Sequence, residues 1–273
     1  MDDSEGSVVT TVTRLASKMV QKIQIPGTTS WAEQENELDV MCIVETRIRT
    51  NKAASIQKRK FKHFFILDNY SSHSNGRIWV MWRNSTISVH CQQSTSQWIH
   101  LQISYGSFLV DVTCVYGFNH PAQRVPLWDF LSTRVTCPIP WLVLGDINCV
   151  RTIDGRISSD PPNLIAMEDF NLAIDAAGLE ELKSQGFWFT WTNKQDQNDR
   201  KWMRLDRALA NVPWFLAFPT TFVEALAPGI SDHSPLVVSF GISLHPKKFS
   251  FTYLKLGPRA VYGSCLQRME NFY

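Results

Sequence analysis

The sequence lacks any CxxC pair, and its six cysteines lie mostly inside apolar runs. CxxC pairs hold zinc and regularly spaced cysteines form disulfides in small secreted chains, so this pattern favours buried, reduced thiols. The N-terminus, Met-Asp-Asp-Ser-Glu, lacks the apolar core of a signal peptide. No apolar stretch approaches the ~20 residues that a membrane-spanning helix needs. The sequence therefore predicts a soluble intracellular protein that does not contact a membrane.

Net charge is also small, because 27 basic residues stand against 25 acidic ones and leave +2. Such a balance indicates neither a protein that coats a polyanion nor one with an acidic tail. Residues 246–273 differ from the rest, with five basic side chains and one acidic one. This basic tail could contact nucleic acid, and a solvated extension is the alternative.

A chain of 273 residues with 44% hydrophobic content can bury one large core. No repeat or low-complexity tract divides it. We expect an atypical N-terminal segment over residues 1–35, one main domain over residues 36–242 and a basic C-terminal tail over residues 243–273.

Apolar runs rich in β-branched and aromatic residues alternate with polar connections, which predicts nine strands. They cover residues 39–44, 61–67, 77–82, 86–91, 98–103, 108–116, 141–146, 187–192 and 235–240. Helical spacing is clearest over Leu164–Ala177, which should end at Gly178, and recurs near residues 126–133. The mixture predicts an α/β (α+β) fold in which helices cover a sandwich of sheets.

One apolar run ends in Gly145-Asp146-Ile147-Asn148, which puts a carboxylate and an amide two residues apart. Side chains alternate along a strand, so Asp146 and Asn148 should face one pocket, with Gly145 permitting a close approach. The carboxylate could accept a proton from water while the amide holds a phosphate oxygen or orients that water. The alternative is a strand-end turn in which both side chains cap backbone groups.

A second polar motif, Ser231-Asp232-His233-Ser234-Pro235, directly precedes an apolar run. In such an entry turn, Asp232 can reach a cation while His233 reaches a substrate. Asp206 is a candidate to accept the imidazole N–H and so to fix the tautomer of the histidine. Alternatively, Asp206 pairs with a neighbouring arginine in Arg204-Leu205-Asp206-Arg207.

Two further strand ends carry polar groups. Glu45 follows the run 39–44 and offers the hard oxygen ligand that magnesium accepts, although it could instead pair with Arg47. Tyr116 and Asn119 follow the run 108–116, where a phenol and an amide could hold a phosphate. For the tyrosine, half-buried packing is the alternative.

In this order, the motifs resemble those of the endonuclease/exonuclease/phosphatase family, whose members include apurinic/apyrimidinic endonucleases and pancreatic deoxyribonuclease. Several segments are more specifically similar to the endonuclease domain of plant LINE-type retrotransposons. They are SSHSNGRIWVMW (71–82), VYGFN (115–119), RLDRALAN (204–211) and SDHSPLVV (231–238). The resemblance covers roughly residues 37–242. It implies a two-sheet β-sandwich flanked by helices, as in the apurinic endonuclease and pancreatic deoxyribonuclease fold.

The resemblance also implies a magnesium-dependent hydrolase of phosphodiester bonds, with manganese as the alternative ion. Glu45 matches the main metal ligand, and Asp232 matches a carboxylate near the metal. Asp146 matches the aspartate that activates or positions the attacking water, and Asn148 matches the amide that orients it. His233, paired with Asp206, matches the histidine that provides acid–base chemistry. Tyr116 and Asn119 match positions that contact phosphate. The implied partner is DNA in the nucleus, where nicking one strand leaves a 3′-hydroxyl that primes reverse transcription.

The sequence departs from the family before Glu45. There the family has a first central strand with a Trp-Asn-Val-Arg-Gly-like motif, whose asparagine helps to hold metal and phosphate. Residues 1–35 contain no asparagine, and Asn36 lies in the polar stretch QENE. The first strand is therefore expected to be lost or replaced, which leaves neighbouring strand edges unpaired unless residues 7–13 substitute.

Loss of one such polar donor can remove ~2.7–4 kcal/mol of transition-state stabilisation, so we expect reduced or absent activity. Two other functions stay open: a nucleic-acid-binding remnant without catalysis, and a phosphatase that acts on a small phosphoester.

Overall fold

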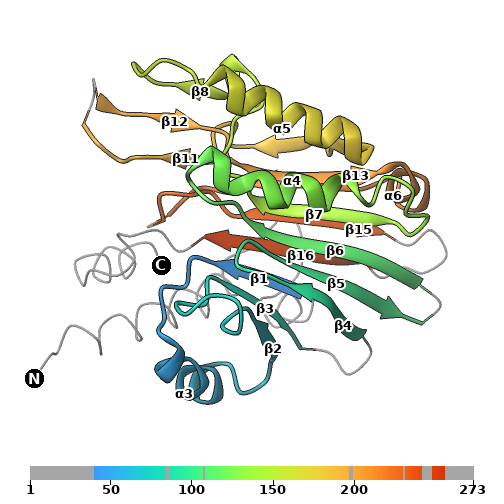
Figure 1. Cartoon of the computed structure of the whole chain (residues 1–273). Coiled ribbons are helices and arrows are strands. Elements are labelled where there is room, and N and C mark those ends of the chain that lie inside the picture. Colours follow the sequence, from blue (N-terminus) through green and yellow to red (C-terminus); the bar gives the residue numbers. More distant parts are fainter. Residues whose placement is uncertain are drawn as a thin grey trace, which may run out of the picture.

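The computed structural model describes residues 40–83, 87–106, 108–196, 199–229, 231–241 and 248–255. Two large sheets form a sandwich with helices on the outside (Figure 1). The order in the first sheet is β10 (Ser184–Gly186), β14 (Phe222–Ala225), β15 (Leu236–Gly241), β16 (Lys248–Lys255), β1 (Val40–Val44), β3 (Ile78–Trp82) and β2 (Phe65–Asp68). The order in the second is β4 (Ile87–Ser94), β5 (Trp98–Tyr105), β6 (Phe108–Tyr116), β7 (Trp141–Asp146), β13 (Asp206–Asn211) and β9 (Leu179–Glu181). The predicted fold class is confirmed.

A small third sheet consists of β11 (Trp191–Thr192), β12 (Trp202–Met203) and β8 (Arg156–Ile157), with the 3-10 turn Ile153–Gly155 before β8. It lies at the end of the sandwich toward which β7 and β16 point (Figure 1).

Strands in the middle of the sandwich are buried on both faces. Leu142 and Leu144 of β7 contact the core between the sheets, whereas Trp141 and Val143 contact the helices outside. This double burial explains why β7 reads as a continuous apolar run in the sequence.

Helices α4 (Val125–Ser132) and α5 (Leu164–Ala177) cover the second sheet, and α3 (Thr50–Lys60) covers the first (Figure 1). The 3-10 turn Pro121–Arg124 leads into α4, and α6 (Val212–Ala217) follows β13. No helix in the described part of the chain is long and apolar enough to cross a membrane.

The prediction for α5 is confirmed at both ends. The side chain of Asn163 accepts a hydrogen bond from the Ala166 N–H, and Gly178 ends the helix at φ +62°. Helix α3 was not predicted, because its sequence is polar and only Ala53 and Ile56 are buried among residues 50–59.

Two predicted strands are shorter than expected. The run 61–67 contributes only β2, since Phe61 and Phe64 lie at the end of α3 and in the following turn. The run 187–192 contributes only β11, and Phe187 and Trp188 are 50% and 51% exposed. Trp188 therefore lies outside the core, although its apolar run is typical of a buried strand.

The strand β16 lies between β15 and β1. It runs antiparallel to β15 and parallel to β1, so that Phe251 is opposite both Val238 and Val40. The edges of β1 and β15 are thus paired. This corrects the prediction of a tail over residues 243–273, since 248–255 form a central strand; residues 1–39, which include 7–13, and 256–273 lie outside the described residues.

Candidate active site

Three predicted site residues form one row across the second sheet. Asp146 on β7 is paired with Tyr116 on β6 in parallel register and with Asp206 on β13 in antiparallel register. Side chains at paired positions share a face of the sheet, here the inner face, and all three residues are buried. Register therefore brings together groups that lie 30 to 90 positions apart in the sequence.

Gly145 sets the spacing between β6 and β7 beside this row. Its φ is +144°, and a Cβ atom built on it would lie 2.1 Å from the carbonyl oxygen of Val115. The close approach that the sequence predicted at this glycine is made by the backbone of the neighbouring strand.

His233 joins the row through Asp206. Its Nδ1 lies 2.7 Å from Asp206 Oδ2, and both side chains are almost fully buried. The His233 N–H donates to Ser231 Oγ, and an isolated β-bridge joins His233 to Trp191 of β11. The structure thus brings the predicted pair together, although the two residues are 27 positions apart.

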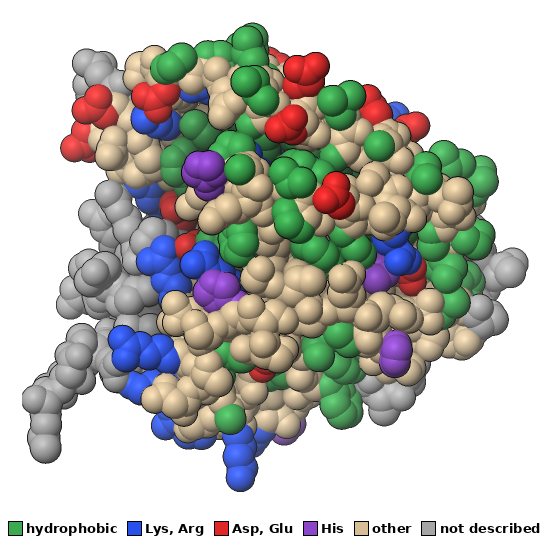
Figure 2. Space-filling model, in the orientation of Figure 1, with side chains coloured by type: hydrophobic (Ala, Val, Ile, Leu, Met, Phe, Trp, Pro, Cys, Tyr) green, Lys and Arg blue, Asp and Glu red, His purple; other side chains and the backbone are tan. Residues whose placement is uncertain are grey.

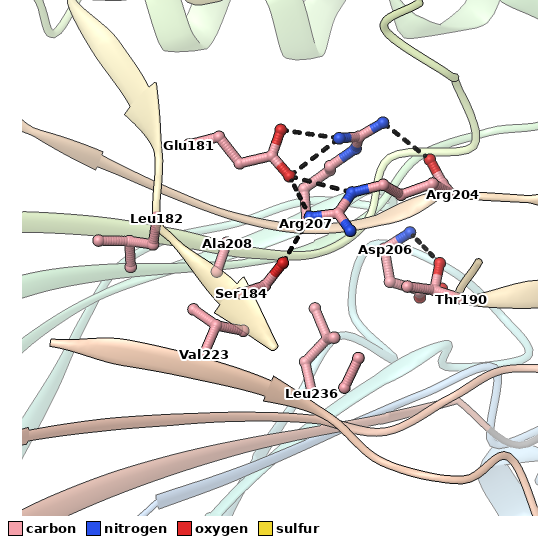
Figure 3. A pocket seen from close by; sticks show the side chains of 11 residues that line it. Glu181, Leu182, Ser184, Thr190, Arg204, Asp206, Arg207, Ala208, Val223 and Leu236 are labelled. Carbon is pink, nitrogen blue, oxygen red and sulfur yellow. Dashed lines mark hydrogen bonds and ion pairs between the residues drawn. The ribbon is translucent and has the colours of Figure 1, made fainter. Parts of the chain in front are cut away.

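Thr190 fixes the backbone on the Asp206 side, because its Oγ1 accepts hydrogen bonds from the N–H groups of Leu205 and Asp206 (Figure 3). The arginines beside Asp206 bind a different carboxylate. Arg204 Nη2 and Arg207 Nη1 each lie 2.7 Å from a Glu181 oxygen (Figure 3). The alternative pairing of Asp206 with a neighbouring arginine is therefore not observed, and the aspartate remains available to the histidine.

Glu45 directly follows β1 with a φ of +53°. Its Oε1 accepts hydrogen bonds from Arg47 Nη2 at 2.7 Å and from Tyr116 Oη at 3.4 Å. Arg77 Nη1 in turn donates to Tyr116 Oη at 2.9 Å. The alternative pairing of Glu45 with Arg47 is therefore observed, and the same carboxylate also lies beside the row.

Residues Glu45, Arg47 and Asn148 all have positive φ values near +53° or +54°. This left-handed conformation is uncommon for residues other than glycine, and it tends to occur at functional sites. Partial burial alone would lower the pKa of Arg47, but its hydrogen bond to Glu45 and the charges of Glu45, Tyr116 and Asp232 raise that pKa overall. One guanidinium therefore lies within electrostatic reach of both predicted metal ligands.

The donor set fits a hard divalent cation. The Asp232 Oδ2 atom accepts from Trp191 Nε1 at 3.4 Å, whereas its Oδ1 is buried and has no hydrogen-bond partner among the described residues. A buried carboxylate oxygen without a donor is a site that a cation can satisfy. Glu45 adds a second carboxylate, and magnesium commonly uses one or two.

A second group of side chains that could bind a metal ion consists of Asp146, Asp206 and His233. One ligand atom from each of these residues lies within 4.8 Å of the other two. The short bond between Asp206 and His233 already joins two of these residues. Two carboxylates beside an imidazole are groups that can accept and donate protons.

Asn148 lies in a turn just after β7. Its N–H donates to Asp146 Oδ1 at 2.8 Å, and its Nδ2 donates to the Gly117 carbonyl at 2.6 Å. This is the strand-end turn that the sequence left open, and it ties the loop after β7 to the loop after β6. Asn119 is exposed on that second loop.

Several residues that support the site were not singled out in the sequence. Arg124 is 2% exposed, and its Nη1 donates to the carbonyls of Phe118, Asn119 and Asn148. Thr190 and Arg77 act on the site as described above. The roles of Arg124, Thr190 and Arg77 depend on contacts between distant segments, which the sequence does not reveal. Only Arg77 had a local indication, because it begins the apolar run 77–82.

The fold is that of the apurinic endonuclease and pancreatic deoxyribonuclease class, since solved structures of this class match it along most of the chain. The chain matches no protein-family model, and no curated protein matches it.

Three solved structures illustrate the likeness. The endonuclease domain of TRAS1, a telomere-specific non-LTR retrotransposon, is 16% identical, with 76% of this chain and 99% of that chain covered and a TM-score of 0.52. An AP endonuclease from Archaeoglobus fulgidus is 16% identical, with coverage of 75% and 89% and a TM-score of 0.54. A truncated TDP2 from Caenorhabditis elegans is 15% identical, with coverage of 86% and 91% and a TM-score of 0.52.

Proposed function

We propose that this chain is a metal-dependent phosphodiester hydrolase that nicks DNA, and that it derives from a plant LINE-type retrotransposon. The observation that carries the proposal is the 2.7 Å contact between His233 and Asp206, with Asp146 next to Asp206 in the row. The TRAS1 domain and the four LINE-like segments support the retrotransposon origin.

Each residue of the site has a chemical task in this proposal. His233 donates its Nδ1 proton to Asp206, so its Nε2 is the nitrogen that serves the scissile phosphate as acid or base. Asp146 accepts a proton from the attacking water, and the hydrogen bond from the Asn148 N–H orients its carboxylate. Tyr116, held by Arg77, supplies a donor for a phosphate oxygen.

Glu45 and Asp232 would hold the divalent cation, magnesium or manganese. When bound, such an ion offsets the negative charge that develops on the phosphate oxygens during attack. Arg47 would then contribute its charge to the phosphate instead of to Glu45.

Slow turnover is part of the proposal. Strand β16 fills the sheet beside β1, but its sequence, KFSFTYLK, contains no asparagine that could replace the family's metal-binding and phosphate-binding amide. A complete scaffold with one donor missing should bind DNA normally and cleave it slowly.

Basic side chains support DNA as the substrate. Figure 2 shows Lys and Arg side chains together on the left of this face, over the loop that follows β1 and over α3 below it. That loop also carries Glu45, so a phosphate backbone bound there would lie next to the proposed cation site. The nucleus is the location that this substrate favours.

The test is nicking of supercoiled plasmid by the purified chain, with magnesium and with EDTA, beside His233→Ala. His90→Ala is the matched control, because His90 is exposed on the edge strand β4, far from β13 in the sheet. We expect relaxed circles that need magnesium, with loss in His233→Ala alone.

Other outcomes contradict the proposal. Binding of DNA that weakens with salt, without nicking by a folded protein, would indicate a binding remnant. Release of phosphate from small esters while plasmid stays intact would indicate a phosphatase.

A further inference from the structure

Strand β16 brings a polar side chain into the middle of the core. Tyr253 is opposite Cys42 of β1 and Leu236 of β15, and it is 0% exposed. Its neighbour on the same face, Phe251, stacks on Phe240 with ring centroids 5.7 Å apart. Both aromatic side chains belong to the cluster of buried residues between the sheets. The Tyr253 side chain therefore lies in the core between the sheets and points toward the opposite sheet.

The opposite sheet presents the row of Tyr116, Asp146 and Asp206. Strands β16 and β7 contact each other across the core, and Tyr253 belongs to the same buried cluster as Tyr116 of this row. Tyr253 Oη and Asp206 Oδ1 are both buried, and neither has a hydrogen-bond partner among the described residues. A buried hydroxyl and a buried carboxylate oxygen without partners are uncommon in folded proteins, and here they complement each other as donor and acceptor.

Charge also supports the contact. Burial, followed by the charges of Asp206 and Asp146, raises the pKa of Tyr253 well above its ordinary value. The phenol therefore keeps its proton and can only donate toward the carboxylate.

We propose that Tyr253 is a positioning residue that donates its hydroxyl proton to Asp206 Oδ1 and so holds Oδ2 against His233 Nδ1. The consequence for cleavage rests on the proposed function, whereas the hydrogen bond itself does not. In this arrangement the carboxylate has one donor on each oxygen, so it cannot rotate away from the imidazole. Strand β16 of the first sheet thereby fixes the orientation of Asp206 in the second sheet.

The experiment compares Tyr253→Phe with Thr252→Val in the full chain. Thr252, the preceding residue of β16, is 5% exposed and faces the other side of the sheet. Its Oγ1 is also buried and has no hydrogen-bond partner within the described part of the chain. Each variant removes one buried hydroxyl from the same strand, but only the first removes the proposed donor. Circular dichroism and thermal melting establish that both are folded.

Two readouts follow for each protein. The first is the ¹⁵N chemical shifts of the His233 ring nitrogens at one fixed pH, assigned by their loss in His233→Ala. The second is kcat and KM for plasmid nicking. We expect Tyr253→Phe to shift the ring nitrogens and to lower kcat about tenfold with KM unchanged, the size expected for one hydrogen bond. Thr252→Val should change neither.

Unchanged ring-nitrogen shifts in Tyr253→Phe would overturn the proposal, as would equal changes in both variants, which would indicate a general effect on β16. If the unmodified chain does not cleave DNA, the proposed function fails, and the chemical shifts alone decide the role of Tyr253.

Discussion

Arg47 Nη2 lies 2.7 Å from Glu45 Oε1, so a guanidinium already neutralises the carboxylate that the proposed function assigns to the metal. The arginine side chain is 45% exposed and the glutamate 12% exposed. The pKa of this arginine is raised overall, as described above, and it stays charged at neutral pH. A divalent cation must therefore share Glu45 with Arg47 or displace it.

Arg47→Gln should strengthen magnesium binding by a factor of about two to five, because a partly exposed ion pair of this kind contributes little free energy. Titration calorimetry with magnesium, repeated with manganese, measures this change. Arg49→Gln is the matched control, since Arg49 is also exposed and the substitution removes the same charge two residues further along the chain. Equal affinity in the Arg47→Gln variant and the unmodified chain would show that Glu45 is not a ligand.

Asp206→Asn should lower kcat for plasmid nicking by roughly 10²- to 10⁴-fold, because an amide cannot stabilise the imidazolium and can impose the wrong tautomer on His233. The free energy of unfolding and KM should change far less. Asp175→Asn on the exposed face of α5 provides the control. A loss within twofold would exclude the pair from the chemistry.

The strand-end motifs could be predicted from the sequence because each one follows a run that is buried on both faces. Glu45, Asp146 and His233 all lie where apolar runs begin or end, and the fold gathers those ends. The row itself could not be predicted, since it depends on the register between β6, β7 and β13. Strand β13 lacks a long apolar run, because its buried inner face carries Ala208 and Ala210 beside Asp206.

The place of β16 was also beyond the sequence. Alternation of aromatic and polar residues near Phe251 and Tyr253 is typical of a strand, but nearby lysines and arginines indicated a tail. Which segment pairs with the free edges of β1 and β15 is a long-range property. Local sequence indicated residues 7–13 as a substitute strand and placed residues 248–255 in a tail.

Phe251→Ala should lower the free energy of unfolding by roughly 3–5 kcal/mol, because it empties a space between the sheets. Phe251 is 4% exposed, whereas Phe65 on the edge strand β2 is 56% exposed and serves as the control. Urea unfolding measures both changes. For Phe65→Ala we expect a much smaller loss.

A chain that ends at residue 243 should fail to fold or should aggregate, because it exposes the edges of β1 and β15. Size-exclusion chromatography and circular dichroism measure this outcome. A monomeric truncated chain with the stability of the full chain would contradict the central position of β16.

A pH-sensitive group lies on the other side of the second sheet. His100 is 1% exposed; its Nδ1 is 2.9 Å from Thr113 Oγ1, and its Nε2 is 3.7 Å from Asp111 Oδ2. Burial, followed by the charge of Arg134, lowers the pKa of His100 to about 4, although the charge of Asp111 opposes both. The folded protein therefore holds this imidazole neutral under conditions in which the unfolded chain would protonate it.

Stability should consequently fall as the pH drops from 6.5 to 4. Above pH 6.5 the imidazole is neutral in both states, so it contributes no pH dependence; below, only the unfolded state takes up the proton until the folded pKa is reached. The shift from the ordinary value corresponds to a loss on the order of 3 kcal/mol across this window. In the His100→Gln variant, the urea midpoints of unfolding at pH 7 and pH 4.5 should differ less than in the unmodified chain. His63→Gln, which changes an exposed histidine, is the control and should keep the full difference. If His100→Gln loses as much stability on acidification as the unmodified chain does, the acid sensitivity comes from other groups.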